Sequence, residues 1–151
     1  MNITSNTKTS KYAGLLLSVL ILVTSTGCER AMGIKIDGKN PPTFTLSGSG
    51  NLVFLSLGEV RDNKPPPLGA PDLWKIRPGV NNKISKLPSI TYGIVPDGFI
   101  QVVPASGAPA PLMEGKVYEF GGPADSAGGG SIWFTIQGGK SMEVSQPGDG
   151  R

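Results

Sequence analysis

The sequence predicts an all-β fold, a small antiparallel β-sandwich, preceded by a leader and a short tether. Short runs rich in apolar and β-branched residues recur beyond residue 41, separated by Gly, Pro, Asn or Asp. No stretch outside the leader repeats apolar residues with the 3.6-residue period of a helix. A parallel sheet would need crossover helices, so antiparallel pairing is expected.

Six to eight short strands are expected, from the runs 43–47, 52–57, 73–77, 90–94, 99–103, 116–120, 132–137 and 140–144. The run 43–47 alternates polar and apolar residues, whereas 52–57 is apolar on both faces, as in a central strand. The run 73–77 places Trp74 and Ile76 on one side. Gly138-Gly139 suits a two-residue hairpin turn, which needs positive φ.

A more specific pattern lies in Leu112-Met113-Glu114-Gly115-Lys116-Val117-Tyr118. It resembles the tyrosine corner of immunoglobulin-like and fibronectin type III domains, in which the tyrosine hydroxyl satisfies a backbone group. The resemblance implies that Leu112, Gly115 and Tyr118 form this structural corner, and that Trp74 is the core tryptophan. The alternative is that Tyr118 is a half-buried strand tyrosine.

The first 28 residues have the three-part order of an export signal. Lys8 and Lys11 precede an uncharged apolar run, 13–23, and small residues then lead to Cys28. The apolar run is shorter than the roughly 20 residues that a membrane-spanning helix needs. The leader is therefore expected to be removed.

Residues 25–28, Ser-Thr-Gly-Cys, resemble the lipobox of bacterial lipoproteins, although Leu is commoner than Ser at the first position. The resemblance implies cleavage between Gly27 and Cys28, a diacylglycerol on the Cys28 sulfur and an acyl group on the new amino terminus. Several acyl chains hold a protein at a bilayer, whereas one chain binds reversibly. The alternatives are an ordinary signal peptide and an uncleaved helical anchor.

The residue after the cysteine is Glu29. In such lipoproteins Asp at this position is the usual inner-membrane retention signal, so the resemblance implies the outer membrane, on its periplasmic face. The inner membrane and the cell surface stay open. The expected domains are the signal peptide 1–27, the lipidated cysteine and tether 28–41, the sandwich 42–145 and a frayed tail 146–151.

The chain has one cysteine and no histidine. Intrachain disulfides, His-containing zinc sites and Ser-His-Asp or Cys-His catalysis are therefore excluded. No catalytic residue, no metal and no cofactor beyond the covalent lipid are expected. A carboxylate-pair hydrolase remains a third interpretation, because two distant carboxylates can meet in space.

The charge distribution gives no indication of nucleic-acid binding. The formal charge of +3 includes Lys8 and Lys11 of the leader, and there is no Lys/Arg run. Residues 61–86 contain six basic and two acidic residues. The simpler interpretation is a solvated surface, and the alternative is a region that meets anionic lipid headgroups or an acidic polymer.

Trp133 is the candidate binding residue. If Ile132, Phe134 and Ile136 face the core, Trp133 faces outward, where it can anchor a partner or stack on a sugar. The alternative is that the Pro-rich segment 104–111 folds over it. The two Pro-rich segments, 61–71 and 104–111, are the other candidate surfaces.

Together these observations predict a membrane-anchored lipoprotein of the cell envelope that acts as a non-catalytic structural or protein-interaction module. Its expected partners are membrane lipid, through Cys28, and an envelope protein. Sandwiches of this kind commonly bind by adding a partner strand at an exposed edge. The alternative is a lipoprotein that binds a glycan or small ligand through Trp133 and nearby loops.

Overall fold

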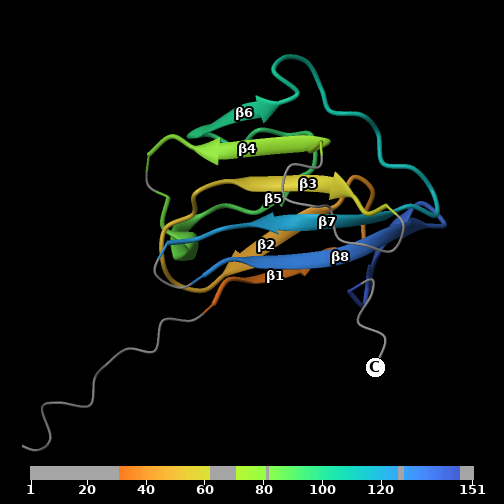
Figure 1. The fold of residues 1–151 in the computed structure, drawn as a ribbon, viewed down its shortest axis with the longest axis horizontal. Helices are drawn as coiled ribbons and strands as arrows, with labels where there is room; N and C mark the ends of the chain where they lie inside the picture. Colours follow the sequence, from red (N-terminus) through yellow and green to blue (C-terminus); the bar gives the residue numbers. More distant parts are fainter. Residues whose placement is uncertain (1–30, 62–70, 81, 126–127, 147–151) are drawn as a thin grey trace, which may run out of the picture.

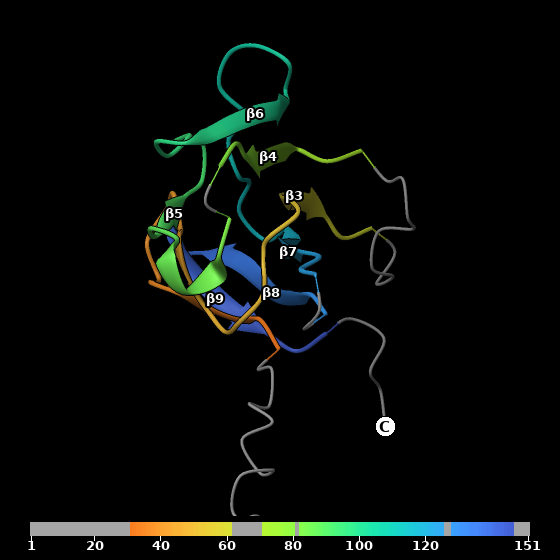
Figure 2. The same cartoon turned by 90° about the vertical axis from the view of Figure 1, so that its left-hand side faces the viewer.

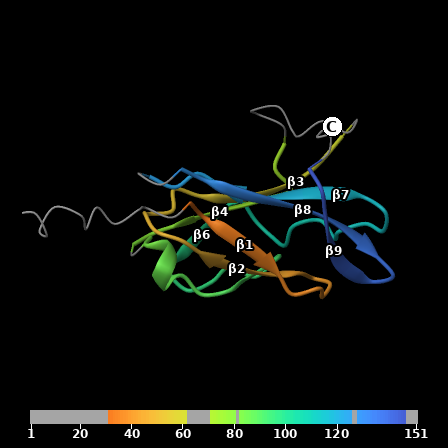
Figure 3. The same ribbon diagram turned by 90° about the horizontal axis from the view of Figure 1, so that it is seen from below.

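The computed structural model describes residues 31–61, 71–80, 82–125 and 128–146. Two antiparallel sheets pack face to face as a small all-β sandwich, which confirms the predicted fold class (Figures 1 and 3). The smaller sheet has the strand order β1-β2-β5, and the larger has the order β6-β4-β3-β7-β8-β9.

The elements in chain order are β1 (Gly33–Ile36), β2 (Thr43–Ser47), β3 (Leu55–Glu59), β4 (Trp74–Pro78), the 3-10 turn η1 (Ile84–Lys86), β5 (Ile90–Thr91), β6 (Phe99–Val103), β7 (Val117–Gly122), β8 (Gly130–Gln137) and β9 (Lys140–Val144). Three strands have the predicted bounds, namely β2, β6 and β9. The β8–β9 turn is made by Gly138 and Gly139, both with positive φ as expected.

The strand order follows the immunoglobulin-like plan. Such domains pair strands A, B and E in one sheet and C, F and G in the other. Here β1, β2 and β5 stand for A, B and E, and β3, β7 and β8 stand for C, F and G. The larger sheet is then extended by β4 and β6 on one side and by β9 on the other.

The core fills the space between the sheets with alternate residues of each strand. Phe44 of the smaller sheet stacks on Phe120 of the larger, with ring centroids 3.7 Å apart. Phe134 meets the same Phe44 ring edge-on at 5.6 Å. Trp74 and Ile76 are fully buried, on the same side of β4 as predicted.

The start of the domain corrects the boundary expected at residue 42. Residues 33–36 form β1 rather than a tether, and they pair with β2 from Gly33↔Ser47 to Ile36↔Phe44. Met32 is already buried. The pairing forms because Ile34 and Ile36 lie on one face and pack against the core. Met32 and β1 therefore belong to the described fold.

The Pro-rich segment 104–111 covers core that the three-stranded sheet is too narrow to reach. The Tyr92 hydroxyl donates to the Ala110 carbonyl at 2.6 Å. The Gln101 side chain accepts from Trp74 Nε1 at 3.1 Å and donates to the carbonyls of Pro104 and Gly107. This segment therefore packs against β6 and against Tyr92, which follows β5, and its loop lies next to β6 at the top of Figure 2.

The sandwich has two ends that matter for the site. We call the end where the chain enters the fold, on the left in Figure 1, the proximal end. It consists of Met32 and residues 48–54, 77–80, 82–86, 96–98, 122–125 and 128–130. The opposite end, which holds residues 37–42, 59–61, 71–73, 104–116 and 137–140, is the distal end.

Candidate functional site

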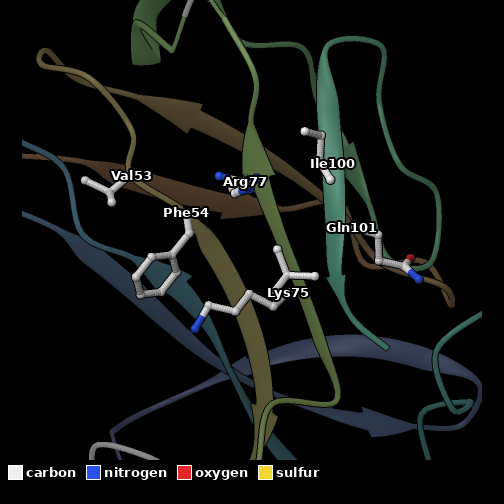
Figure 4. A pocket seen from close by; sticks show the side chains of 7 residues that line it. Val53, Phe54, Lys75, Arg77, Ile100 and Gln101 are labelled. Carbon is white, nitrogen blue, oxygen red and sulfur yellow. The ribbon is translucent and has the colours of Figure 1, made fainter. Parts of the chain in front are cut away.

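An open groove lies on the outer face of the larger sheet, over β3, β4 and β6. Its volume is about 550 Å³. We call it the β6 groove, and its lining residues are Val53, Phe54, Lys75, Arg77, Ile100, Gln101 and Val102 (Figure 4).

The alternation of the strands creates this lining. Because Trp74 and Ile76 point into the core, Lys75 and Arg77 of the same strand point outward. On β6 the outward residues are Ile100 and Val102, which are 49% and 41% exposed. The groove therefore combines apolar walls with two cationic side chains.

The two cations of the groove differ in their partners. Lys75 Nζ lies 3.1 Å from Asp72 Oδ2 and 4.1 Å from the centroid of the Phe54 ring, so it is neutralised and also packs on the aromatic face (Figure 4). Within the described part of the chain, Arg77 forms no ion pair. Arg77 therefore offers a guanidinium to an occupant of the groove.

The strand β6 is an edge of the larger sheet. It pairs with β4 on one side, and on the other side no strand of the described residues pairs with it. An edge strand presents backbone N–H and C=O groups that can pair with another chain. Ile100 and Val102 place exposed apolar surface beside those groups.

Trp133 lies on the outer face of β8, opposite in direction to Ile132 and Phe134, as predicted. Its cross-strand neighbours are Glu119 on β7 and Val144 on β9. The side chain is partly buried, and its indole nitrogen is buried with no hydrogen-bond partner among the residues that the structure describes. The indole therefore offers no free donor to a sugar, and the segment 104–111 packs elsewhere.

The segment 112–118 forms a tight corner at the distal end. The Tyr118 hydroxyl accepts a hydrogen bond from the Met113 backbone N–H at 2.8 Å. Leu112 is buried, and Gly115 has a φ of +74°. This is the arrangement that the resemblance to a tyrosine corner implies, and it gives these residues a structural part.

Burial also changes the acidity of both buried tyrosines. Desolvation raises the pKa of Tyr92 to about 12, and the nearby Tyr118 adds to the rise. Desolvation raises the pKa of Tyr118 as well. Both hydroxyls are therefore neutral hydrogen-bonding groups, and neither is prepared to act as a base near neutral pH.

Several sequence-predicted site residues lie outside the described residues. These are Gly27 and Cys28 of the lipobox, most of the segment 61–71 and the end of the tail after Gln146. Among the residues that the structure describes, no group of three His, Cys, Asp or Glu side chains is placed to hold a metal ion. Likewise, no helix of the described part is long and apolar enough to cross a membrane.

The sequence did not single out Phe54, Arg77, Ile100 or Val102 as site residues. The available signal was the run 52–57, which is apolar on both faces. In a two-layer sandwich one face of each strand is solvated, so such a run predicts an apolar patch on the outer face. Phe54 supplies that patch.

Comparison with known proteins finds no protein-family model, no curated protein and no solved structure that matches this chain. The candidate site therefore rests on the geometry of the groove and of the β6 edge.

Proposed function

We propose that this chain is a lipid-anchored lipoprotein of the bacterial cell envelope that acts as a non-catalytic protein-interaction module. The resemblance of residues 25–28 to a lipobox supports the anchor through Cys28 and the place on the periplasmic face of the outer membrane. The lack of histidine and the neutral tyrosines support a role in recognition rather than catalysis.

The observation that carries the interaction role is the edge strand β6. Its outward residues Ile100 and Val102 are exposed, and the adjoining groove is apolar with one unpaired cation. A partner strand added at this edge gains backbone hydrogen bonds from β6. The side chains of that strand on the outer face would lie beside Ile100 and Val102, and an acidic residue among them would meet Arg77.

Site-specific crosslinking in the native bacterium tests the proposal. A photoreactive amino acid at Val102 of the full-length chain is expected to capture one discrete envelope protein, and Ile100→Lys is expected to abolish the capture. The same photoreactive residue at Thr45, an exposed position of the smaller sheet, is the matched control. Equal capture from both positions, or none from Val102, would contradict binding at β6.

The groove also favours a second function, a lipoprotein that binds a small apolar ligand. Phe54 and Val53 provide an apolar floor, and Arg77 suits a ligand that carries an anionic group. A fluorescent fatty acid is the probe for this function. Binding that Phe54→Ala and Arg77→Ala both weaken, with the Trp133→Phe variant unchanged, would favour the ligand over the partner strand.

A further inference from the structure

We propose that the proximal end of the sandwich is a docking surface for an anionic lipid bilayer, so that the domain lies with this end against the membrane. The orientation rests on the lipid anchor of the proposed function. The docking surface itself rests on the charges and exposed apolar side chains of the folded domain.

The path of the chain places the anchor at the proximal end. Met32 is buried there, and a Cβ at Gly130 would meet the Met32 carbonyl oxygen, so the entering chain packs directly against the start of β8. Cys28 is four residues earlier, and an extended chain of four residues spans about 14 Å at most. A lipid on Cys28 therefore keeps the proximal end within about that distance of the bilayer surface.

The cations of the proximal end are free of ion pairs. Arg77, Lys83 and Lys86 are exposed, and none of them pairs with a carboxylate of the described residues. The three ion pairs of the described chain lie toward the distal end, and their acidic members are Asp37, Asp72 and Glu59. Three of the six described cations without an ion pair therefore lie beside the anchor, and the other three, Lys35, Arg61 and Lys140, are spread over β1 and the distal end.

The carboxylates of the proximal end neutralise only part of this positive charge. Asp125 is directed at Asn51, whose backbone N–H and side-chain amide both donate to it. These hydrogen bonds lower the pKa of Asp125, which therefore stays charged. Asp97 is exposed in the turn before β6. With three cations against two carboxylates, the described proximal end is net positive.

Two exposed valines stand beside the cations. Val80 is 75% exposed and Val53 is 52% exposed, and both belong to proximal loops. The Leu52 backbone N–H donates to the Asn82 carbonyl at 2.7 Å, and the Asn82 side-chain amide donates to the Leu52 carbonyl at 3.2 Å, which brings the two loops together. Apolar side chains flanked by cations suit the headgroup layer, where the side chains leave water and the cations meet phosphates.

The attraction is too weak to hold the domain alone but is sufficient to orient a tethered one. One cation near an anionic membrane contributes about fivefold in affinity, which corresponds to about 1 kcal/mol. A tether converts this weak contact into an intramolecular one at high effective concentration. Docking would set the Val53 and Arg77 side of the β6 groove next to the bilayer and direct the β8–β9 turn away from it.

An environment-sensitive fluorophore reports the orientation in lipidated protein reconstituted into vesicles. One label is attached at Val80→Cys, and the control label at Gln137→Cys, next to the distal turn. The vesicles contain either phosphatidylcholine alone or an equal mixture of phosphatidylglycerol and phosphatidylcholine. We expect a blue shift at position 80 in the mixed vesicles, its loss in high salt, and no shift at position 137.

Charge-reversal variants test whether the proximal lysines cause the docking. Lys83→Glu with Lys86→Glu is expected to lower the docked fraction about tenfold or more, whereas Lys140→Glu at the distal end leaves it unchanged. An equal shift at positions 80 and 137 overturns the proposal, as does a shift at position 80 that survives the double reversal. A charge-dependent shift with soluble heparin but not with vesicles overturns the assignment to a lipid surface.

Failure of the anchor is distinguishable from failure of the docking surface. Without acylation the protein does not remain with phosphatidylcholine vesicles, and Cys28 takes up the label. The unacylated protein is then tethered to the mixed vesicles through Cys28 and a maleimide lipid, with the fluorophore introduced at position 80 as an unnatural amino acid. A blue shift that requires Lys83 and Lys86 supports the surface, and its absence overturns the surface. If the protein is acylated but the label at position 80 shows no blue shift, the anchor is supported and the docking surface is overturned.

Discussion

Tyr118 links its strand to the preceding corner through one hydroxyl. Tyr118→Phe removes the acceptor of the Met113 N–H and is expected to lower the free energy of unfolding by about 1 kcal/mol, equal to a fall of about 4 °C in Tm. A thermal melt measures it. An unchanged Tm would show that the hydroxyl has no part in stabilising the corner.

Tyr92 gives the domain a dependence on alkaline pH. Its pKa is raised to about 12 by burial, so the folded state keeps the proton that the unfolded state loses near pH 10. The contribution to stability is complete below pH 10 and falls as the pH rises toward 12. Denaturant unfolding on both sides of pH 10 is expected to show this loss, and Tyr92→Phe is expected to reduce it.

Trp133 combines buried apolar surface with an unpaired donor. Trp133→Ala is expected to cost about 2 kcal/mol, less than the 3–5 kcal/mol typical of a fully buried tryptophan. Trp133→Phe removes the buried N–H that has no partner and is expected to stay within about 1 kcal/mol of wild type. Thermal melts of both variants check this, and equal losses would mean that the donor costs nothing.

For single residues, the sequence predicted which face of a strand a side chain lies on better than it predicted what surrounds that side chain. The two-residue period placed Trp74 inward and Trp133 outward, because alternation is a local property of a strand. It did not predict that the Trp133 nitrogen is buried, since that depends on what neighbouring strands and loops contribute. Arg77 was visible as a charge, but its lack of an ion pair depends on the positions of distant carboxylates.

Among the elements, the ends of β7 and β8 depend on glycine because backbones meet there. A Cβ at Gly122 would collide with the Phe54 carbonyl oxygen, and one at Gly130 with that of Met32. Gly122→Ala is expected to cost about 3 kcal/mol or more, because backbone on both sides must move. Denaturant unfolding measures the loss.

Gly107→Ala is the matched control for that steric argument. No atom lies within 4 Å of a Cβ at Gly107, but its φ of +78° is unfavourable for alanine. Its expected cost is about 1–2 kcal/mol, from backbone conformation alone. A Gly122→Ala variant as stable as this control would mean that the strands separate easily at the proximal end.

The ends of the strands were predicted correctly only where the local sequence marks them. β2, β6 and β9 were predicted with their observed bounds, because glycine, proline or serine directly flanks each of them. β1 was assigned to the tether, since four residues beside Gly38 and two prolines give a weak pattern until β2 is present to pair with them. The run 90–94 shortens to β5 because only Ile90 and Thr91 face β2.

For the molecule as a whole, the decisive residue is Cys28. Cys28→Ser removes the thiol that would carry the diacylglycerol, so the variant is expected to remain an unprocessed precursor. Mass spectrometry of the wild-type protein is expected to show the leader removed and acyl groups on Cys28. A free, unmodified Cys28 in soluble material would contradict the lipoprotein assignment.

The sandwich class was predictable because repeated short strand-like runs and missing helical periodicity extend over the sequence beyond residue 41. The β6 groove was not, because it forms where Phe54, which directly precedes β3, meets Arg77 of β4 and Ile100 of β6. Their neighbourhood follows from the order β6-β4-β3, in which β6 returns beside β4 after the chain has visited the other sheet. No local pattern specifies that return.

The first strand has a mechanical consequence for an anchored protein. Tension between a bilayer at the proximal end and a partner bound farther out would act along β1, through Gly33. Its four register pairs with β2 would then be sheared together, whereas a sideways pull would unzip them singly from Gly33↔Ser47. If the domain stands upright on a lipid anchor, tension would run along the strands of the smaller sheet, the direction in which the β1–β2 pairs must break together.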